Sequence, residues 1–380
     1  PNGELWVGTA MGIDVYNRGK RLRSITPQEG MPCADVHSIA FDAQGNAWIG
    51  TSLGLFRLSD DQWTLRHSLR WLPHDDVRDV ALTTDGTAWI ATAGGLSALA
   101  SKPMTLADKA EHFDQLVRSR HVRPPGMVEK CRLKTPGDLS TYEDMDTDND
   151  GSYTGMYVAA ESFRYAVTGA EDARENASES MRALEFLHSV TETGGFFART
   201  VVPSHWEQMA DMNHEYTPIE IAERRSDEAR FKPVNVRWRP SSDGKWLWKG
   251  DTSSDDVTGP YYTFGVYHDL VADEAEKKRI AQLTAQLTDY IINGGYVLRD
   301  QDGEATRWGV WSPEKLNHDP NWRLDRGINS IEILSFLLTA HHLTGDKKYL
   351  TELEKLYNDH GYRQNILEPQ QLDPGAFTHI

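Results

Sequence analysis

The spacing of hydrophobic residues changes near residue 100 of this 380-residue chain. Before that point, short apolar runs are separated by turn-forming glycine, asparagine and aspartate, a pattern typical of β-strands. After it, apolar residues recur every three or four positions, as they do on one face of a helix. We therefore expect a β-rich part at residues 1–100 and a largely helical part beyond it.

The β-rich part contains an internal repeat marked by tryptophan. Trp6, Trp48 and Trp89 lie 42 and 41 residues apart, and a glycine and a short apolar run follow each of them. A period of about 40 to 45 residues with four short strands is typical of a β-propeller blade. Residues 1–100 supply little more than two such units, whereas propellers close with about four to eight blades. The sequence therefore predicts an incomplete propeller, with further blades expected outside it.

The region between the two parts has a different character. An amphipathic pattern over residues 106–116 predicts one helix, and the proline-containing segment 121–126 is typical of a linker. We therefore assign residues 101–152 to a linker with a leading helix. Residues 153–380 are assigned to a helical domain.

The helical domain repeats one form three times: an apolar helix, a tight turn, and a more charged helix that ends at glycine. The predicted pairs are 157–168 with 171–187, 262–271 with 274–292, and 328–343 with 348–358. Repeated hairpins of this kind build an α/α toroid, with the apolar helices forming an inner ring. An α-solenoid fits less well, because long linkers at 196–259 and 296–326 separate the pairs.

The expected fold class is therefore multidomain β + α, with partial β-propeller blades followed by an α/α toroid of helical hairpins. Three hairpins and one leading helix would fill little more than half of a six-hairpin ring, so the toroid is also expected to be incomplete. Residues 364–380 show no helical period.

Composition and charge exclude several classes of protein. The formal net charge is −17, and most of the acidic excess lies beyond residue 100, which argues against a nucleic-acid partner. No apolar stretch reaches the 18 or so residues that a membrane span needs; the best run, 331–343, is interrupted by polar residues. Cys33 and Cys131 lie in different predicted parts, so neither a disulfide framework nor a paired-cysteine metal site is expected.

Candidate chemistry concentrates in one stretch, residues 246–262. It contains Trp248, Lys249, Asp251, Asp255, Asp256, Tyr261 and Tyr262. Tryptophan rings stack on the C–H faces of sugars, and neighbouring carboxylates move protons, so this mixture is typical of a sugar site. The alternative is the start of a helix, with a polar N-cap and acidic residues in the first turn. Both interpretations stay open.

A second acidic segment precedes the first hairpin. Asp146, Asp148, Asp150 and Gly151 match the start of a calcium loop, in which alternating carboxylates face one ion. The acidic residue expected near the twelfth position is missing, since Tyr157 stands there, so we predict no cofactor but leave calcium open at the three aspartates. The segment could instead direct Asp148 and Asp150 into the mouth of the toroid, or form a solvated acidic turn.

The two long linkers add further candidates. In the first, His214 is followed by Glu215 and Tyr216, and could act as an acid or base, bind a sugar carboxylate, or serve only as a hydrogen-bonding residue. No HExxH signature is present, so zinc is not favoured at this histidine. The second linker offers aromatic faces for stacking, one imidazole and two cations: Trp308, Trp311, Trp322, His318, Arg323 and Arg326. The tryptophans could instead form a packed lid over the ring.

Several segments together resemble a known family. They are the tryptophan repeats and residues 148–151, 159–169, 248–255, 308–313 and 326–335. They are similar to secreted bacterial proteins that join propeller repeats of the two-component-regulator type to an (α/α) toroid of the glycoside hydrolase and polysaccharide lyase kind. The resemblance implies a secreted or periplasmic location and a glycan ligand, without assigning one activity. Asp256 and Pro260 depart from the expected Glu and His, and an aspartate would fall about one methylene short of a proton donor's reach.

The first functional interpretation is a glycoside hydrolase acting on a polysaccharide or oligosaccharide. One of Asp251, Asp255 or Asp256 would protonate the leaving oxygen, and Asp150 would activate water.

Two alternatives remain. A polysaccharide lyase acting on uronates would use Tyr261, Tyr262 or His214 as the base and Arg323 or Arg326 to neutralise the substrate carboxylate. A glycan-binding or sensory protein without catalysis would use the same aromatic and charged residues for binding alone.

Overall fold

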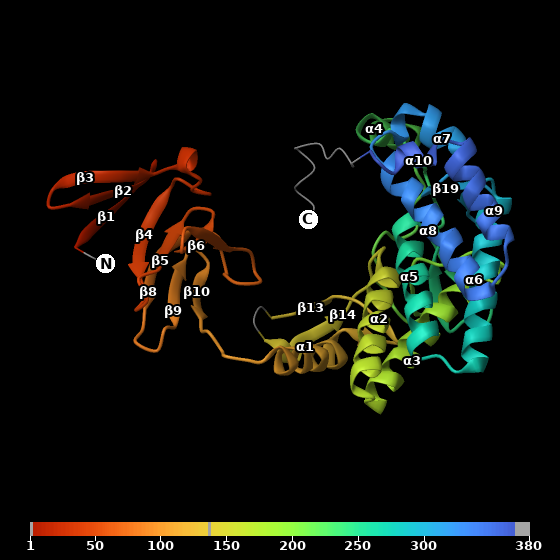
Figure 1. The fold of residues 1–380 in the computed structure, drawn as a ribbon, viewed down its shortest axis with the longest axis horizontal. Helices are drawn as coiled ribbons and strands as arrows, with labels where there is room; N and C mark the ends of the chain where they lie inside the picture. The colour runs from red at the N-terminus through yellow and green to blue at the C-terminus, as the bar shows by residue number, and fades with distance from the viewer. Residues whose placement is uncertain (1–2, 136–137, 369–380) are drawn as a thin grey trace. The chain divides into compact units, whose positions relative to one another are not determined.

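The structure is a computed structural model that describes residues 3–135 and 138–368. The chain divides into two compact units, Pro1–Lys109 and Ala110–Ile380 (Figure 1). Most of the tail that we expected to lack helical structure, from residue 369 onward, lies outside the described residues.

Unit 1 consists of three small antiparallel sheets, each a meander of consecutive strands. The first contains β1 (Glu4–Thr9), β2 (Gly12–Asn17) and β3 (Lys20–Ile25); the second contains β4 (Val36–Phe41), β5 (Ala47–Thr51), β6 (Gly54–Ser59) and β7 (Gln62–Arg66); the third contains β8 (Val77–Leu82), β9 (Ala88–Thr92) and β10 (Gly95–Leu99). The second sheet has the four strands of a complete propeller blade. The predicted partial blades are therefore confirmed.

A threonine stabilises the same tight turn in each sheet. The Oγ1 atoms of Thr9, Thr51 and Thr92 donate to the carbonyl oxygen of the glycine three residues later, at 3.0, 2.8 and 2.9 Å. Each threonine oxygen also accepts a hydrogen bond from the backbone N–H two residues later. Because these bonds are local to the turn, each threonine and glycine of the repeated sequence forms the same turn in its own sheet.

The sheets of unit 1 pack on one another through two hydrophobic clusters. Ile13 and Ile49 belong to the cluster between the first and second sheets. Leu55, Val77 and Ile90 belong to the cluster between the second and third sheets. Both clusters draw on neighbouring sheets, as the interiors of stacked propeller blades do.

Unit 2 is mainly helical. Helix α1 (Leu106–Arg120) begins at the end of unit 1 and continues into unit 2. The other helices of unit 2 are α2 (Asp150–Thr168), α3 (Glu171–Ser189), α4 (Pro218–Asp227), α5 (Ser254–Leu270), α6 (Glu274–Asn293), α7 (Pro313–His318), α8 (Arg326–Thr344), α9 (Lys348–Glu354) and α10 (Tyr362–Asn365). The three predicted hairpins are α2 with α3, α5 with α6, and α8 with α9. Helix α2 packs against α5 and α5 packs against α8, which makes these three the inner row (Figure 1). Partial blades followed by helical hairpins are thus the observed fold class.

Helix α5 begins eight residues earlier than its hydrophobic pattern predicted. Ser253 and Asp256 form a capping box, in which each side chain pairs with the backbone N–H of the other residue. This box starts the helix at Ser254 and leaves Pro260 inside it. The alternative interpretation of this stretch as the start of a helix, with a polar N-cap and acidic residues in the first turn, is therefore confirmed.

Two glycines bring α2 and α5 into close contact. A Cβ atom on Gly155 would lie 2.6 Å from Thr263 Oγ1 and 3.0 Å from the carbonyl oxygen of Gly259. A Cβ atom on Gly259 would lie 2.6 Å from Ser152 Cα. Since real Cβ atoms do not approach so closely, glycine at both positions is what allows the two helices to pack at this distance.

The long linkers of unit 2 form short strands as well as loops. The small antiparallel sheets pair β11 (Val122–Arg123) with β12 (Met127–Val128), β13 (Cys131–Leu133) with β14 (Tyr142–Asp144), β17 (Trp246–Lys249) with both β15 (Val201–Pro203) and β16 (Trp238–Pro240), and β18 (Val297–Arg299) with β19 (Ala305–Val310). A four-residue turn connects the end of β17 at Lys249 to the start of α5 at Ser254.

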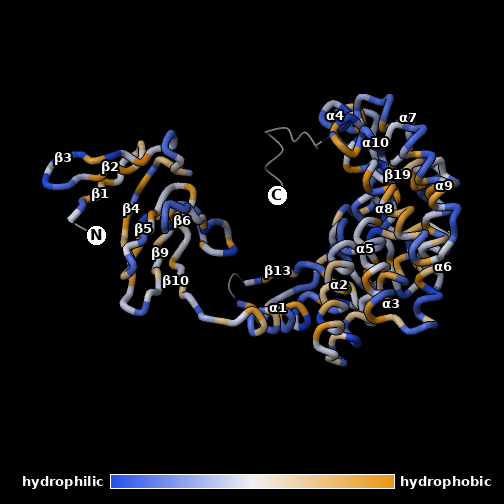
Figure 2. Tube along the Cα trace, viewed as in Figure 1, coloured by the Kyte–Doolittle hydropathy of each residue, from blue (hydrophilic) through white to orange (hydrophobic). Residues whose placement is uncertain are grey.

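One large hydrophobic cluster fills the interior of unit 2, and it includes Leu184, Phe264, Leu287 and Phe336 from four different helices. Hydrophobic segments recur along these helices where they pack together (Figure 2). Cys33 and Cys131 are both free cysteines. None of the helices in the described residues combines the length and hydropathy that a membrane crossing requires.

Candidate functional site

A cleft of about 610 Å³ lies where the amino-terminal ends of the inner helices meet in unit 2. Four carboxylates, two guanidinium groups and two tryptophans contribute to its lining: Asp148, Asp255, Asp325, Glu332, Arg199, Arg230, Trp308 and Trp322. Acidic and aromatic side chains in one cavity are the combination that a sugar site requires.

Asp255 and Asp148 come from two neighbouring helix starts. Asp255 lies in the first turn of α5 and is exposed. Asp148 precedes α2 and is half-buried. Ser152 Oγ, in the first turn of α2, donates to the carbonyl oxygen of Asp255 at 2.5 Å. This bond, together with the close packing at Gly155, fixes the position of one helix start relative to the other.

Glu332 enters the cleft from α8. Trp311 Nε1 donates to its Oε2 at 2.9 Å, which fixes the direction of the carboxyl group. Burial raises the pKa of Glu332 to about 7, and the nearby negative charge of Asp255 adds to the rise. A carboxyl group with such a pKa is mostly protonated below pH 7 and about half protonated at pH 7, so it can still donate a proton under conditions in which an ordinary glutamate is ionised.

Asp148 lies in the opposite electrostatic environment. It forms ion pairs with Arg199 at 2.8 Å and with Lys249, which is fully buried. Burial alone would raise the pKa of Asp148, but these two cations bring it below its ordinary value. One cleft thus contains a carboxyl group held as a proton donor and another held as an anion.

The aromatic wall of the cleft encloses a cation. The guanidinium carbon of Arg230 lies 4.3 Å from the ring centroid of Trp308 and 4.7 Å from that of Trp322. Arg230 also pairs with Asp325, the residue that precedes α8. Trp322 is buried whereas Trp308 is half-buried, so Trp308 is the ring with surface left to offer a ligand.

Asp256 lies beside the cleft but is buried. Its Oδ2 accepts from Arg199 Nε at 2.7 Å and from Ser253 Oγ at 2.7 Å. Burial raises the pKa of Asp256 to about 6 although Arg199 opposes the shift. Arg199 therefore bridges Asp256 to Asp148, which places Asp256 in the support of the cleft.

Asp251 is also fully buried and lies in a turn of left-handed backbone, at φ 56°. Its Oδ1 accepts from the backbone N–H of Arg307 at 3.1 Å, and its Oδ2 lies 3.4 Å from Arg237 and 3.7 Å from a guanidinium nitrogen of Arg307. Its own N–H donates to Asp300 at 2.9 Å. Asp251 thus joins the turn before α5 to β19, and the strained backbone is maintained by these partners.

Asp150 is buried in the first turn of α2, where it pairs with Arg123 and accepts from Thr200 Oγ1 and from the Thr147 backbone N–H. Burial raises the pKa of Asp150 and Arg123 opposes that rise. Asp150 does not line the cleft. Its carboxylate is instead occupied by side chains that tie α2 to the segments on either side of it.

The predicted aromatic residues separate into buried and exposed groups. Trp248, Tyr261 and Trp311 are buried. Tyr261 stacks on Phe336 at a centroid distance of 4.2 Å and shares a 2.7 Å hydrogen bond with Thr288. Tyr262 is 54% exposed but does not line the cleft.

Other predicted residues lie at separate cavities of unit 2. His214 lines a cavity of about 540 Å³ and bonds Glu220 at 3.0 Å. His318, Arg323 and Arg326 line another of about 520 Å³. Of the residues that the sequence singled out, the structure brings Asp148, Asp255, Trp308 and Trp322 together at the cleft.

The three aspartates at which we left calcium open have separate partners. Both Asp146 oxygens lie 3.1 Å from the Ala210 backbone nitrogen, whereas Asp148 and Asp150 pair with different cations, as described above. A cavity of about 690 Å³ adjoins Asp146, Asp148 and Asn149. It contains no tryptophan in its lining, so it lacks the stacking faces of the 610 Å³ cleft.

Sequence reasoning missed three cleft residues: Arg230, Asp325 and Glu332. Glu332 carried a signal, because it is a lone acidic residue near the start of an otherwise apolar inner helix. Burying a charged side chain is costly, so an acidic residue in such a position indicates a functional or paired role. Arg230 and Asp325 carried none, because they are brought together only by the fold.

Comparisons with known proteins give limited information. A model of the two component regulator propeller family matches residues 30–52, which include the Trp48 repeat. No curated protein matches the chain. The repeat type predicted from the sequence is therefore confirmed, and it occurs in one chain with helical hairpins.

One similar solved structure is the extracellular domain of the hybrid two component system BT4673 from B. thetaiotaomicron. It is 20% identical to this chain, and the match covers 27% of this chain and 14% of that chain with a TM-score of 0.24. A family 76 glycoside hydrolase from a bovine Bacteroides thetaiotaomicron strain has 9% identity over 94% of this chain and 77% of that chain, also with a TM-score of 0.24. The chain thus spans about a seventh of the length of BT4673. TM-scores of this size carry no argument about function.

Proposed function

We propose that this protein is a carbohydrate-active enzyme, a glycoside hydrolase, that binds its glycan in the 610 Å³ cleft. The observation that carries the proposal is that Asp255, exposed, and Glu332, with a pKa raised to about 7, line one cleft beside the partly exposed ring of Trp308. Hydrolysis of a glycosidic bond needs one carboxyl group that gives a proton and a second that acts at the anomeric carbon.

In this proposal Glu332 protonates the leaving oxygen, because its raised pKa leaves a large protonated fraction up to about pH 7. Asp255 acts on the anomeric carbon, either directly or by activating water. Trp308 stacks on a sugar ring. The anion at Asp148 stabilises positive charge that develops on the ring in the transition state.

These roles revise the assignment made from the sequence. Asp255 is kept, and the proton donor moves to Glu332. Asp150, Asp251 and Asp256 become positioning residues, because each is buried and bonded to arginine. The shift follows from burial: a catalytic group must reach the substrate, and these three side chains do not.

A lyase fits the site less well. Burial raises the pKa of Tyr261, and its hydroxyl already pairs with Thr288, so it is a poor base. Tyr262 and Arg323 lie outside the cleft. For a lyase reaction in this cleft, other residues than those we assigned would have to act as the base and as the arginine that neutralises the substrate carboxylate.

The glycan partner and the secreted or periplasmic location remain predictions. The acidic cleft favours a neutral or basic glycan over a polyanionic one, because like charges repel. Two arginines moderate this preference without reversing it.

The test is a screen of the purified protein against neutral and acidic polysaccharides, read in two channels. A hydrolase releases reducing ends without new ultraviolet absorbance, which is the expected result. A lyase also produces the absorbance of an unsaturated uronate, and this product would overturn the proposal. If the protein releases no reducing ends and produces no absorbance, but migrates more slowly in a gel that contains the glycan, it is a glycan-binding protein without catalysis.

A further inference from the structure

A second cluster of polar side chains lies at the other end of the helices that carry Asp255 and Glu332. His268 and Asp269 are near the carboxyl end of α5, and His342 is near the carboxyl end of α8. Asp269 is 14 residues from Asp255, or roughly 21 Å along the helix at 1.5 Å per residue. The cluster is therefore separate from the cleft.

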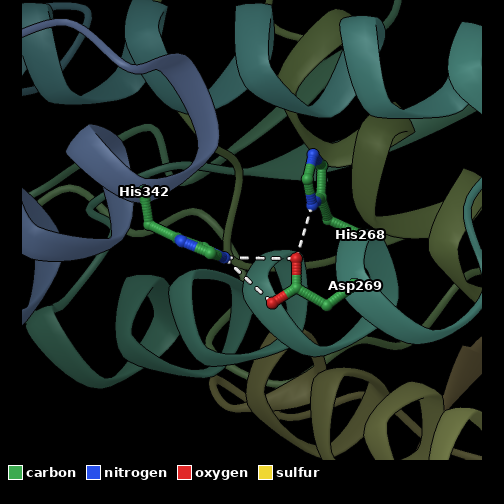
Figure 3. A group of neighbouring side chains, drawn as sticks. All are labelled: His268, Asp269 and His342. Carbon is green, nitrogen blue, oxygen red and sulfur yellow. Dashed lines mark hydrogen bonds and ion pairs between the residues drawn. The ribbon is translucent and has the colours of Figure 1, made fainter.

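The three side chains converge on one point between the two helices (Figure 3). His268 Nδ1 lies 2.7 Å from Asp269 Oδ1, and His342 Nε2 lies 2.9 Å from Asp269 Oδ2 and 3.1 Å from Oδ1. Each residue offers a donor atom, and these atoms all lie within 4.8 Å of one another. Among the described residues, this is the group of histidines and acids with such a spacing.

We propose that His268, Asp269 and His342 bind a zinc ion that ties α5 to α8. Two imidazoles and one carboxylate are ligands that zinc accepts, with bonds of about 2.0 to 2.2 Å. A tetrahedral ion with such bonds places its ligands roughly 3.3 Å apart. Each histidine donor lies 2.7 to 3.1 Å from an Asp269 oxygen, and all three donor atoms lie within 4.8 Å of one another, so side-chain rotations can bring them to face one ion.

The charge of the cluster also suits a cation. The ion pairs that Asp269 makes in the described residues are both with histidines, which bind metal in their neutral form. His342 and Asp269 are exposed and His268 is half-buried, so an ion can reach the site from solvent. A fourth position is left for water.

The consequence of binding is mechanical. Asp255 and Glu332 must keep a set separation to act on one bond, and they lie on the two helices that the ion would join. Zinc at the far end restrains how α5 moves against α8, in addition to their hydrophobic contact. The zinc proposal does not depend on the proposed hydrolase activity, because binding can be measured on its own.

The test uses protein without a histidine tag, dialysed against chelator and titrated with zinc chloride by calorimetry. We expect one zinc per chain and a rise in Tm on binding. His342→Ala and Asp269→Asn should each weaken zinc binding by at least about tenfold, since each removes a ligand or its charge.

His341→Ala is the matched control. His341 is adjacent on α8, but its ring bonds the backbone oxygen of Asp346 instead of Asp269. This variant should bind zinc as the native protein does. The proposal is overturned if the native protein binds no zinc, or if His342→Ala and His341→Ala bind it equally well. In either case the cluster is a set of hydrogen bonds without a metal.

Discussion

Trp311 Nε1 lies 2.9 Å from Glu332 Oε2, and this hydrogen bond holds the one cleft carboxyl group whose pKa burial raises to about 7. Trp311 itself is fully buried and packs edge-on against Phe336. A buried tryptophan has little freedom to rotate, so the carboxyl group it bonds is directed toward the cleft. We expected the indole of Trp311 to stack on a sugar, but in the structure it orients the carboxyl group of Glu332.

Glu332→Gln should abolish turnover while preserving the fold. Glutamine keeps the size and the acceptor for Trp311 but cannot donate an acidic proton, so kcat should fall by about 100- to 10,000-fold. Kinetics on a substrate found in the screen, with circular dichroism for the fold, measure this. Glu314→Gln, an exposed change on α7, is the control and should leave kcat unchanged. Normal turnover in Glu332→Gln would exclude it as the acid.

The pH dependence should report the same group. Glu332 must be protonated to act, so kcat/KM should fall as pH rises through about 7. The free energy of unfolding should also fall as pH rises from about 4.5 to 7, because the unfolded chain loses this proton first. Denaturant unfolding at several pH values measures the second effect, and Glu332→Gln should make the fall shallower while leaving the part that comes from Asp256 and Asp150, whose pKa values are also raised. A profile flat to pH 9 would contradict the assignment.

Asp255→Asn should remove activity by a similar factor with little change in Tm. The side chain is exposed, and asparagine can still accept the hydrogen bond that Ser253 donates. Asp359→Asn, another exposed aspartate of unit 2, serves as the control for the loss of one charge. If both variants keep native activity, the catalytic role must move to Asp148 or Asp325.

Arg123→Met should destabilise the protein. It would leave Asp150 buried without its cation, a change that costs about 3 to 5 kcal/mol in other buried pairs. Urea unfolding should show a lower midpoint, and Asp150→Asn should lower it less. If Asp150→Asn instead removed turnover at unchanged stability, the catalytic role predicted from the sequence would be restored.

Thr51→Val should lower the stability of unit 1 by about 1 to 3 kcal/mol. Valine has the same shape, but it loses the bonds to the Gly54 carbonyl and the Leu53 N–H at a fully buried site. Thr51→Ser should keep most of the native stability, because serine retains the hydroxyl group that makes both bonds. The measurement is thermal unfolding of the full chain. Equal Tm values for the native and valine proteins would show that the turn bonds contribute nothing.

The parts of the fold that depend on neighbours in sequence were readable from the sequence. The tryptophan repeat predicted blades because Thr51 and Gly54 make their turn contacts within three residues. Helical hairpins were predicted because hydrophobic spacing reports which face of a helix is buried. Helix α5 was the exception at its boundary: hydrophobic spacing placed its start at residue 262, whereas the capping box of Ser253 and Asp256 starts it at Ser254.

The site depended on contacts that no local pattern records. Asp251, Asp255 and Asp256 look equivalent in sequence, yet Asp255 alone is exposed, whereas Asp251 and Asp256 are buried and pair with Arg237 and Arg199 from other segments. Glu332 joins Asp255 only because α5 packs on α8. The sequence by itself determined the repeats, the hairpins and the kinds of side chain available, since these follow from short-range periodicity. Tertiary structure decided which carboxylate reaches solvent and which keeps its proton, because burial and charge pairing are set by residues that lie 14 to 57 positions away, as Arg237 does from Asp251 and Arg199 from Asp256.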